Sequence, residues 1–266
     1  AARERSNQYI LEKKYERDIS VSIEASGPIG IVFLSDQHLD APGCDIERAE
    51  NDARMIAQTP GMFAILPGDI NDLARLKTWG AMTNQMLPQD GIALTRHYLG
   101  LFGGKILAAH TGNHDEWLRK ISGVDSLGTI AGVLWSHHSG TISLYVGDKP
   151  EKYVIFSTHR TTRNSQQNYT HTCFRALESL DSVPHDTDVV VVGHSHTGSQ
   201  ETRPWKGRNR VGIRPGSYKV EDDLFVEMGM NSNRPSYGAI FWPNSHRVMG
   251  CDIDCMKDVL DIYYSK

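Results

Sequence analysis

Side chains of the kind that bind metals follow five apolar runs of this 266-residue sequence, each at the point where the run ends. The run "VVVV" leads into "GHSH", which places His194 and His196 one residue apart, and "IVFLS" leads into Asp36 and His38 in the same spacing. Residues two apart in an extended chain leave it on the same side. The other such positions are Asp69 after "FAILPG", Asn113, His114 and Asp115 after "KILAAHTG", and His159 after "VIFST". If these runs are strands of a shared sheet, we expect the side chains to gather at the carboxyl edge of that sheet.

The residue types at this edge indicate a metal centre. Imidazoles, carboxylates and one amide oxygen suit Mn²⁺, Fe or Zn²⁺ better than the all-oxygen site that Ca²⁺ prefers. Seven such ligands exceed what one ion needs, whereas two ions roughly 3.5–4 Å apart and bridged by a carboxylate would use them all. Gly68, Gly112 and Gly193 precede three of the groups and allow tight turns there. An isolated His-x-His would more often simply end a strand, so the prediction depends on convergence.

The elements that must position these groups alternate along the chain. Ile46, Ala49, Ala53 and Ile56 share one helical face, which predicts a helix over 45–60. We expect strands within 27–40, 61–72, 104–117 and 188–196, two helices within 73–103 broken at 87–91, two strands around a turn in 141–160, a helix over 172–182, paired strands in 238–242 and 246–254, and a short C-terminal helix. Strands separated by helices predict an α/β or mixed α+β sandwich, and the tight turns predict that part of it is antiparallel.

Composition bounds the class of protein. The charged residues 1–20 are predicted to form a peripheral arm or helix, and 21–266 a single domain. No apolar run is long enough for a transmembrane helix, the N-terminus lacks the apolar region of a signal peptide, and a net charge of −4 gives no overall reason to expect a nucleic-acid partner. Four scattered cysteines, Cys44, Cys173, Cys251 and Cys255, are expected to be reduced thiols, which favours a cytoplasmic protein.

The ordered set of polar blocks resembles the calcineurin-like metallophosphoesterase family. The pattern of that family is D-x-H, G-D, G-N-H-D/E, a lone His and G-H-x-H. Here the blocks read "DQH" at 36–38, "GD" at 68–69, "GNHD" at 112–115, His159 and "GHSH" at 193–196, within about residues 30–220. "RPGSY" at 214–218 resembles the Pro-Gly-Ser turn that commonly follows the last block. The chain also resembles phage- and prophage-encoded members.

The resemblance implies a fold, a cofactor and a role for each residue. The fold would be a four-layer α/β/β/α sandwich, and the cofactor two divalent metal ions, Mn²⁺ first, with Fe, Zn²⁺, Mg²⁺, Ni or Co as alternatives. The first ion would be held by Asp36, His38 and His196, the second by Asn113, His159 and His194, and Asp69 would bridge them. His114 would act beside the metals on the phosphoryl oxygen or the leaving group, with Asp115 or Asp36 orienting it.

The reaction implied is hydrolysis of a phosphate ester by attack of a metal-bridging hydroxide, with charge stabilisation as the larger contribution to catalysis. A phosphodiesterase acting on nucleotides or nucleic acid is the leading hypothesis. One alternative is a phosphomonoesterase acting on a protein or small molecule. Another, of a different class, is a non-catalytic scaffold that keeps the fold and binds a partner.

Some residues keep two interpretations. His137, His138 and His171 are rivals to His159 for the lone-histidine position, although His159 ends a clear strand. Asp72 could hold the tautomer of a metal-binding histidine or cap the following helix.

Two basic segments are also open. Arg160 and Arg163 could bind the substrate phosphate with Asn113 and His114, or they could be solvated loop charges. The basic segment 203–214 could follow a nucleic-acid backbone, with Trp205 as a stacking face, or form an ordinary solvated hairpin.

Overall fold

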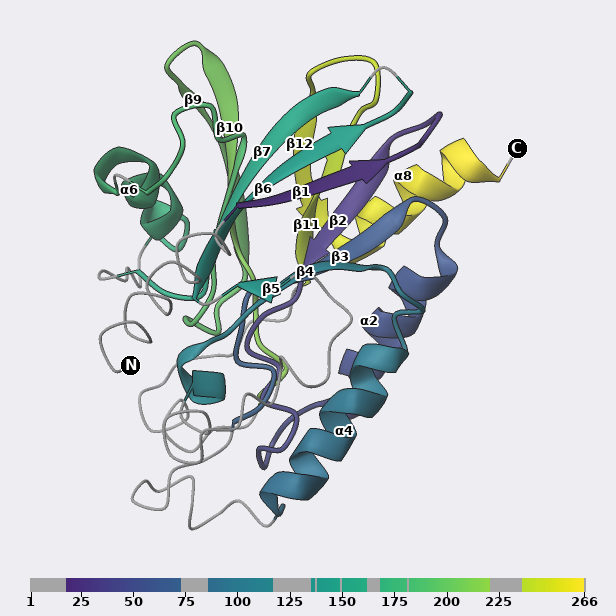
Figure 1. The fold of residues 1–266 in the computed structure, drawn as a ribbon, viewed down its shortest axis with the longest axis vertical. Coiled ribbons are helices and arrows are strands. Elements are labelled where there is room, and N and C mark those ends of the chain that lie inside the picture. Colours follow the sequence, from purple (N-terminus) through teal and green to yellow (C-terminus); the bar gives the residue numbers. More distant parts are fainter. Residues whose placement is uncertain are drawn as a thin grey trace, which may run out of the picture.

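Two six-stranded mixed sheets pack face to face, with helices on their outer faces (Figure 1). The structure is a computed structural model, and it describes residues 18–72, 86–116, 135–136, 138–148, 150–161, 168–180, 182–220 and 236–265. The four-layer α/β/β/α sandwich implied by the resemblance is therefore confirmed. We call the sheet that contains β2 the β2 sheet and the other one the β7 sheet.

The β2 sheet has the strand order β12-β11-β2-β3-β4-β5. Strands β2 (Ile29–Phe33), β3 (Met62–Leu66), β4 (Ile106–His110) and β5 (Trp135–Ser136) are parallel neighbours. The other two, β11 (Tyr237–Phe241) and β12 (Val248–Asp252), pair antiparallel at the opposite edge, as the sequence predicted for this pair. The parallel arrangement brings the carboxyl ends of β2, β3 and β4 to one edge.

The β7 sheet has the order β1-β6-β7-β8-β10-β9. Its strands are β1 (Asp18–Ile23), β6 (Ser139–Val146), β7 (Glu151–Thr158), β8 (Val189–Val192), β9 (Ser199–Trp205) and β10 (Arg208–Arg214). The β6–β7 pair is antiparallel, as predicted for 141–160, while β8 lies parallel to both β7 and β10. Residues 18–20 belong to β1, so the predicted boundary of the arm at residue 20 falls inside a strand of the sheet; residues 1–17 lie outside the described ranges.

Helices cover both outer faces. The β2 sheet is covered by α2 (Ile46–Gln58) and α8 (Ile253–Tyr264), with α4 (Pro88–Gly100) beside α2, and the β7 sheet by α6 (His171–Ser179). The helix predicted over 45–60 is confirmed as α2, and Asp45 caps it by accepting a hydrogen bond from the Arg48 backbone N–H at 3.1 Å.

The segment 87–91 does not merely break a helix, as predicted, but begins α4, because a proline is tolerated in the first turn of a helix. The other helix expected before it lies outside the described residues. No helix in the described part of the chain has the length and apolar character needed to span a membrane.

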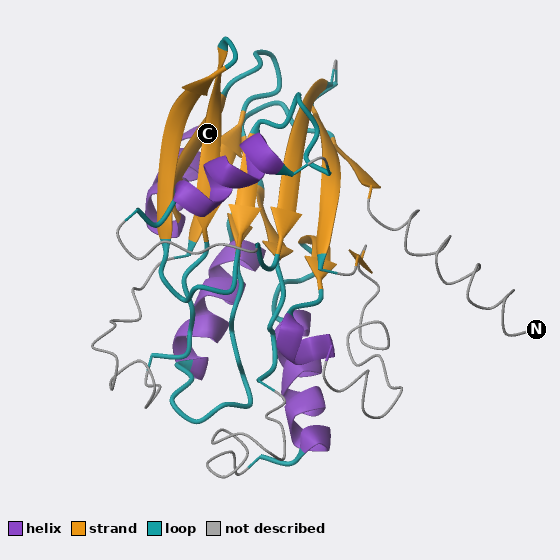
Figure 2. Cartoon of the chain, turned by 90° about the vertical axis from the view of Figure 1, so that its left-hand side faces the viewer, coloured by secondary structure: helices purple, strands orange, loops and turns teal. Residues whose placement is uncertain are grey.

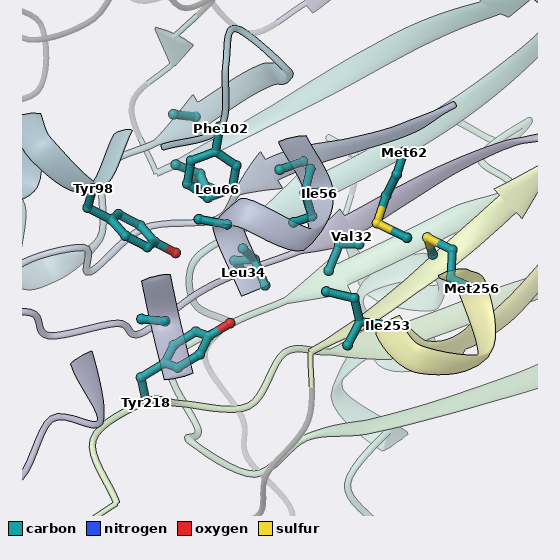
Figure 3. Packing of buried hydrophobic residues seen from close by; sticks show 14 of the residues in the cluster. Val32, Leu34, Ile56, Met62, Leu66, Tyr98, Phe102, Tyr218, Ile253 and Met256 are labelled. Atoms are coloured by element: carbon teal, nitrogen blue, oxygen red, sulfur yellow. The ribbon is translucent and has the colours of Figure 1, made fainter. Parts of the chain in front are cut away.

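Alternating side chains divide the core into layers. Ile31 and Phe33 of β2 point into the core between the two sheets, where they meet residues of β6, β7, β8 and β10. Val32 points to the other face, into the core beneath α2 and α8 that Figure 3 shows. All of these side chains are essentially inaccessible to solvent. The four consecutive valines of β8 are likewise buried on both faces, which is why that run is continuous rather than alternating.

Figure 2 shows the strands running along the length of the sandwich, with many of the connecting loops gathered at one end. The loops that follow β2, β3, β4, β7 and β8 contain all of the predicted metal ligands. The fold therefore positions these groups on segments that are distant in sequence and held by two rigid sheets.

Candidate metal centre

The backbone is strained at the predicted ligands. Five of them, Asp36, His38, Asp69, His194 and His196, have positive φ angles of 55°, 48°, 54°, 72° and 53°. Such angles are uncommon for residues other than glycine and cost free energy unless the surrounding structure enforces them. Among the remaining described non-glycine residues, only His138 and Lys206 share this conformation. Concentration of strain in these loops is typical of a functional site.

Backbone hydrogen bonds join the loops after β2 and β3. The Asp36 N–H donates to the Gly68 carbonyl at 3.0 Å, and the His38 N–H to the Asp69 carbonyl at 3.1 Å. Ser217, in the Pro-Gly-Ser turn noted in the sequence, donates its hydroxyl to the Asp36 carbonyl at 2.6 Å. These bonds fix the first two ligand loops relative to each other and to the turn after β10.

One group of metal-ligand atoms comes from the loops after β2 and β8. The Nε2 atoms of His38 and His196 lie 3.1 Å apart, and the Asp36 Oδ1 atom lies 3.9 Å from the first and 3.5 Å from the second. Two imidazole nitrogens that face each other can share one proton at most, so at least one lone pair points into this space. Asp36, His38 and His196 are the residues that the resemblance assigned to the first ion.

A second group lies beside the first. It contains Asp36, Asp69, His159 and His194, whose ligand atoms all lie within 4.8 Å of one another. The His159 Nε2 atom is 3.0 Å from the Asp69 Oδ2 atom and 3.1 Å from the Asn113 Oδ1 atom, so the amide also faces this group. Asp36 belongs to both groups of ligand atoms. The bridging role that the resemblance gave to Asp69 stays a prediction.

The hydrogen bonding of the Asp36 and Asp69 carboxylates indicates whether this site suits cations. The Asp36 Oδ2 atom accepts from the His194 N–H at 2.9 Å, and the Asp69 Oδ1 atom accepts from the His114 N–H at 2.8 Å. Across the described part of the chain, the other oxygen of either group, Asp36 Oδ1 or Asp69 Oδ2, forms no hydrogen bond of good geometry. These oxygens face only imidazole nitrogens, His196 Nε2 at 3.5 Å from Asp36 and His159 Nε2 at 3.0 Å from Asp69. A buried charged oxygen without a partner is costly. Divalent cations among these donors would remove that cost, so the residues present fit a two-metal site.

The electrostatics of the cluster keep its carboxylates ionised. Burial alone would raise the pKa of Asp36, but the nearby imidazoles of His196 and His159 hold that pKa far below its usual range. The pKa of Asp69 is also lowered, by His159 acting against burial. Burial lowers the pKa of His159, but Asp69 and Asp36 outweigh it and raise that pKa to about 9. Both carboxylates are therefore ionised in the folded protein.

Asp72 positions two histidines. Its Oδ1 atom lies 3.1 Å from the Nδ1 atom of His38 and 3.2 Å from the Nδ1 atom of His114. The same His114 nitrogen also lies 2.6 Å from the Asp72 carbonyl oxygen, so it carries the proton and donates to it. Of the two interpretations of Asp72, the geometry favours the one in which it holds histidine tautomers.

The structure gives Asp115 a role different from the one expected. Its Oδ2 atom accepts from the backbone N–H groups of Asp69, at 2.8 Å, and Gly112, at 2.9 Å. Asp115 therefore ties together the loops after β3 and β4, while Asp72 contacts the His114 ring. Burial and the nearby Asp69 charge raise the pKa of Asp115 to about 7. Asp36, the other residue expected to orient His114, belongs to the metal-ligand groups.

His159 is the lone histidine that the structure brings to the cluster. The backbone carbonyl of His138 accepts a hydrogen bond from the His159 N–H at 2.8 Å, and His171 is exposed at the start of α6. The remaining rival, His137, lies outside the described residues.

Of the two predicted phosphate-binding arginines, only Arg160 can be placed, since Arg163 also lies outside the described ranges. Arg160 is exposed next to the cluster. Its charge contributes, after burial, to lowering the pKa of His194 to about 4.

Two features were not recognised from the sequence. Arg214 is 1% exposed, donates to the Tyr169 carbonyl at 2.8 Å and precedes the turn whose Ser217 bonds the Asp36 carbonyl, so it lies near the metal-ligand groups. Its position before the Pro-Gly-Ser turn was the available signal.

Conversely, the turn that carries Lys206 sits at the far end of the β9–β10 hairpin from His194, because β9 leads away from the ligand loops. The basic tip of segment 203–214 is therefore not beside the cluster.

Comparisons with known proteins give distant structural similarity only. Neither the protein-family models nor the curated proteins contain a match. Among solved structures, calcineurin-like phosphoesterase YfkN from Bacillus subtilis is 12% identical, with 90% of this chain and 99% of that one covered and a TM-score of 0.44. A conserved protein from Streptococcus pneumoniae TIGR4, described as a predicted phosphoesterase, is 16% identical, with coverage of 86% and 92% and a TM-score of 0.41. The nuclease MPE from Pseudomonas putida is 13% identical, with coverage of 83% and 87% and a TM-score of 0.37. All three TM-scores lie below 0.5, so the function proposed below rests on the residues of the site.

Proposed function

We propose that this chain is a two-metal phosphoesterase of the calcineurin-like metallophosphoesterase type. The observation that carries the proposal is a pair of adjacent metal-ligand groups that share Asp36 and contain buried carboxylate oxygens with no well-formed hydrogen bond. His38 and His196 would hold one ion with Asp36. Asp69, His159 and His194 would hold the other, together with the amide oxygen of Asn113. Two divalent cations in such a site lower the pKa of a bound water and neutralise charge on phosphoryl oxygens.

His114 and Arg160 would act on the substrate beside the metal ligands. The His114 Nδ1 atom is held by Asp72, so the opposite nitrogen, Nε2, is directed toward the cluster, 4.0 Å from the Asp69 Oδ2 atom. The side chain is 21% exposed, which leaves the ring accessible to a bound ester. From this place His114 would donate to a phosphoryl or leaving-group oxygen. The exposed Arg160 would pair with the phosphate.

For the substrate class we propose a phosphodiester of a nucleotide or nucleic acid. Tyr169, 37% exposed, lies beside the guanidinium of Arg214 with 5.7 Å between the Arg Cζ atom and the ring centroid. An exposed aromatic ring next to a phosphate-cleaving site offers a surface on which a base can stack. Mn²⁺ is the metal we would supply first.

The test is hydrolysis of bis-p-nitrophenyl phosphate and of p-nitrophenyl phosphate by metal-free protein to which Mn²⁺ is added back. We expect Mn²⁺-dependent release of nitrophenol, faster from the diester. Faster turnover of the monoester would favour a phosphomonoesterase instead. No turnover of either compound with any divalent metal would refute the proposal and favour a non-catalytic scaffold. Labelled single- and double-stranded DNA and cyclic nucleotides, assayed in parallel, would then define the substrate.

A further inference from the structure

A cavity lies at the end of the sandwich opposite the candidate metal centre. It has a volume of about 480 Å³ and is formed by the turn that joins β9 to β10 and by the segment that leads into β12. Figure 1 shows these two turns at the same end of the molecule. The β10 strand begins at this cavity with Arg208 and ends near the metal-ligand groups with Arg214. Seven residues of strand separate the two sites by roughly 20 Å.

The floor of the cavity is a rigid, internally satisfied network around Asp188. This buried carboxylate accepts from Arg210 at 3.2 Å and from the His246 Nε2 atom at 2.9 Å through Oδ1, and from the Val154 N–H at 2.9 Å through Oδ2. The His246 ring stacks on Tyr153, with ring centroids 4.8 Å apart and an interplanar angle of 23°. Because the Asp188 charge is already compensated by Arg210, the floor does not repel an anion.

The walls of the cavity carry uncompensated positive charge. Arg208 and Arg247 both line it and both are exposed. Within the described ranges, neither guanidinium forms an ion pair with a carboxylate, although the Arg247 Cζ atom lies 5.8 Å from the centroid of the Trp242 ring. Of the acidic groups nearby, Asp186 is paired with Lys152 at 3.6 Å, and Glu151 faces the Nδ1 atom of His246 at 3.7 Å.

We propose that this cavity is a binding site for a small phosphorylated anion, separate from the metal centre. The planar donors of an arginine match the oxygens of a phosphate group, and here two arginines face one pocket. The side-chain amide of Asn209 adds a neutral hydrogen-bonding group to the lining. The volume is in the range of pockets that hold nucleotide-sized ligands. The inference does not depend on the proposed phosphoesterase activity.

The test is isothermal titration calorimetry of the full chain with inorganic pyrophosphate and with ADP, in the presence of a chelator so that neither probe can bind through metal ions. We expect saturable binding of at least one probe. The double variant Arg208→Ala/Arg247→Ala should weaken it at least tenfold. Arg175→Ala is the control, because Arg175 is a partly exposed arginine on α6 that pairs with Glu178 away from the cavity, and it should leave binding unchanged. Asp69→Asn should also bind the probes normally, because Asp69 belongs to the other site.

Thermal unfolding of each variant establishes that it is folded. If the double variant is not, the single variants Arg208→Gln and Arg247→Gln replace it, each with an expected loss of several-fold. Binding of pyrophosphate as well as ADP would show that the phosphate groups suffice, and binding of ADP alone would show that the organic part is also recognised. No saturable binding to the unmodified chain, or equal binding by the double variant, would overturn the proposal.

Discussion

At the scale of single residues, the cluster is defined by two buried carboxylates, Asp36 and Asp69, whose negative charge the surrounding hydrogen bonds do not fully compensate. One oxygen each of Asp36 and Asp69 is buried without a well-formed hydrogen bond, and the Nε2 atoms of His38 and His196 lie only 3.1 Å apart. A fold selected only for stability would pair or remove such groups. Their retention is explained by ligands that are cations.

Replacing Asp69 by Asn should abolish hydrolysis and reduce bound metal. The amide keeps the size of the side chain but removes the charge that compensates a cation. We expect at least a 100-fold loss of Mn²⁺-dependent turnover. The measurements are bis-p-nitrophenyl phosphate hydrolysis and elemental analysis of the purified variant.

Asp186→Asn is the matched control, since Asp186 is an exposed carboxylate whose side chain lies beside Lys152 at the far end of the sheet. It should retain full activity and metal. Normal metal content in Asp69→Asn would contradict the assignment of Asp69 as a ligand.

Replacing His114 by Ala should separate catalysis from metal binding. His114 belongs to neither of the two groups that contain Asp36, and it contacts Asp72 instead. We expect metal content to stay normal while turnover falls by about 10²–10⁴-fold. Elemental analysis beside steady-state kinetics checks this, and a His114→Ala protein that loses both metals would show that the assigned role is wrong.

At the scale of elements, the site depends on how strands end. Each ligand loop leaves a strand whose side chains are largely buried, so its start is fixed by the core. The chain then passes through left-handed conformations or glycines that turn the ligands inward. The loops after β3 and β4 approach so closely that Gly112 has no room for a side chain. A Cβ atom at that position would lie 2.5 Å from the Asp69 backbone nitrogen and would overlap the Asp69 carboxylate.

Gly112→Ala should therefore damage the metal centre although it changes no ligand. The added methyl group must displace the loop that carries Asp69, so we expect loss of bound metal and of most of the activity. Gly100→Ala is the control, because a Cβ atom at this last residue of α4 would meet nothing within 4 Å. That variant should keep its activity and gain up to about 1 kcal/mol of stability. Equal activity of the two variants would argue against the close approach of these loops.

At the scale of the whole molecule, metal binding should be coupled to stability. The ligands come from both sheets, so cations would link the β2 sheet to the β7 sheet through Asp36 on one side and His159, His194 and His196 on the other. A ligand that binds only the folded state stabilises it by about 2.7 kcal/mol at 100 times its dissociation constant.

Addition of Mn²⁺ to metal-free protein should raise the melting temperature by roughly 5–10 °C for a chain of this size. Differential scanning calorimetry with and without a chelator measures the effect. The same addition to Asp69→Asn should give a much smaller rise. An equal rise in both proteins would mean that Mn²⁺ stabilises the fold elsewhere.

The sequence by itself determined the strands that end in ligands and the residue types that they present. Apolar runs such as 189–192 and the helical face of 46–58 are local patterns, set by burial and by the periodicity of strand and helix. The ordered blocks were enough to predict the sandwich and to name a set of side chains that the fold then brings together.

Only the tertiary structure decided how these groups meet. It brought His159 to Asn113 across 46 positions of sequence, made Asp36 the carboxylate common to both groups, and gave Asp72 rather than Asp115 to the His114 ring. It also carried the basic tip of the β9–β10 hairpin away from the cluster, to a cavity of its own. The physical reason is that the periodicity of a strand or helix fixes the face on which each side chain lies. The distances between loops instead follow from how the two sheets pack across their shared core.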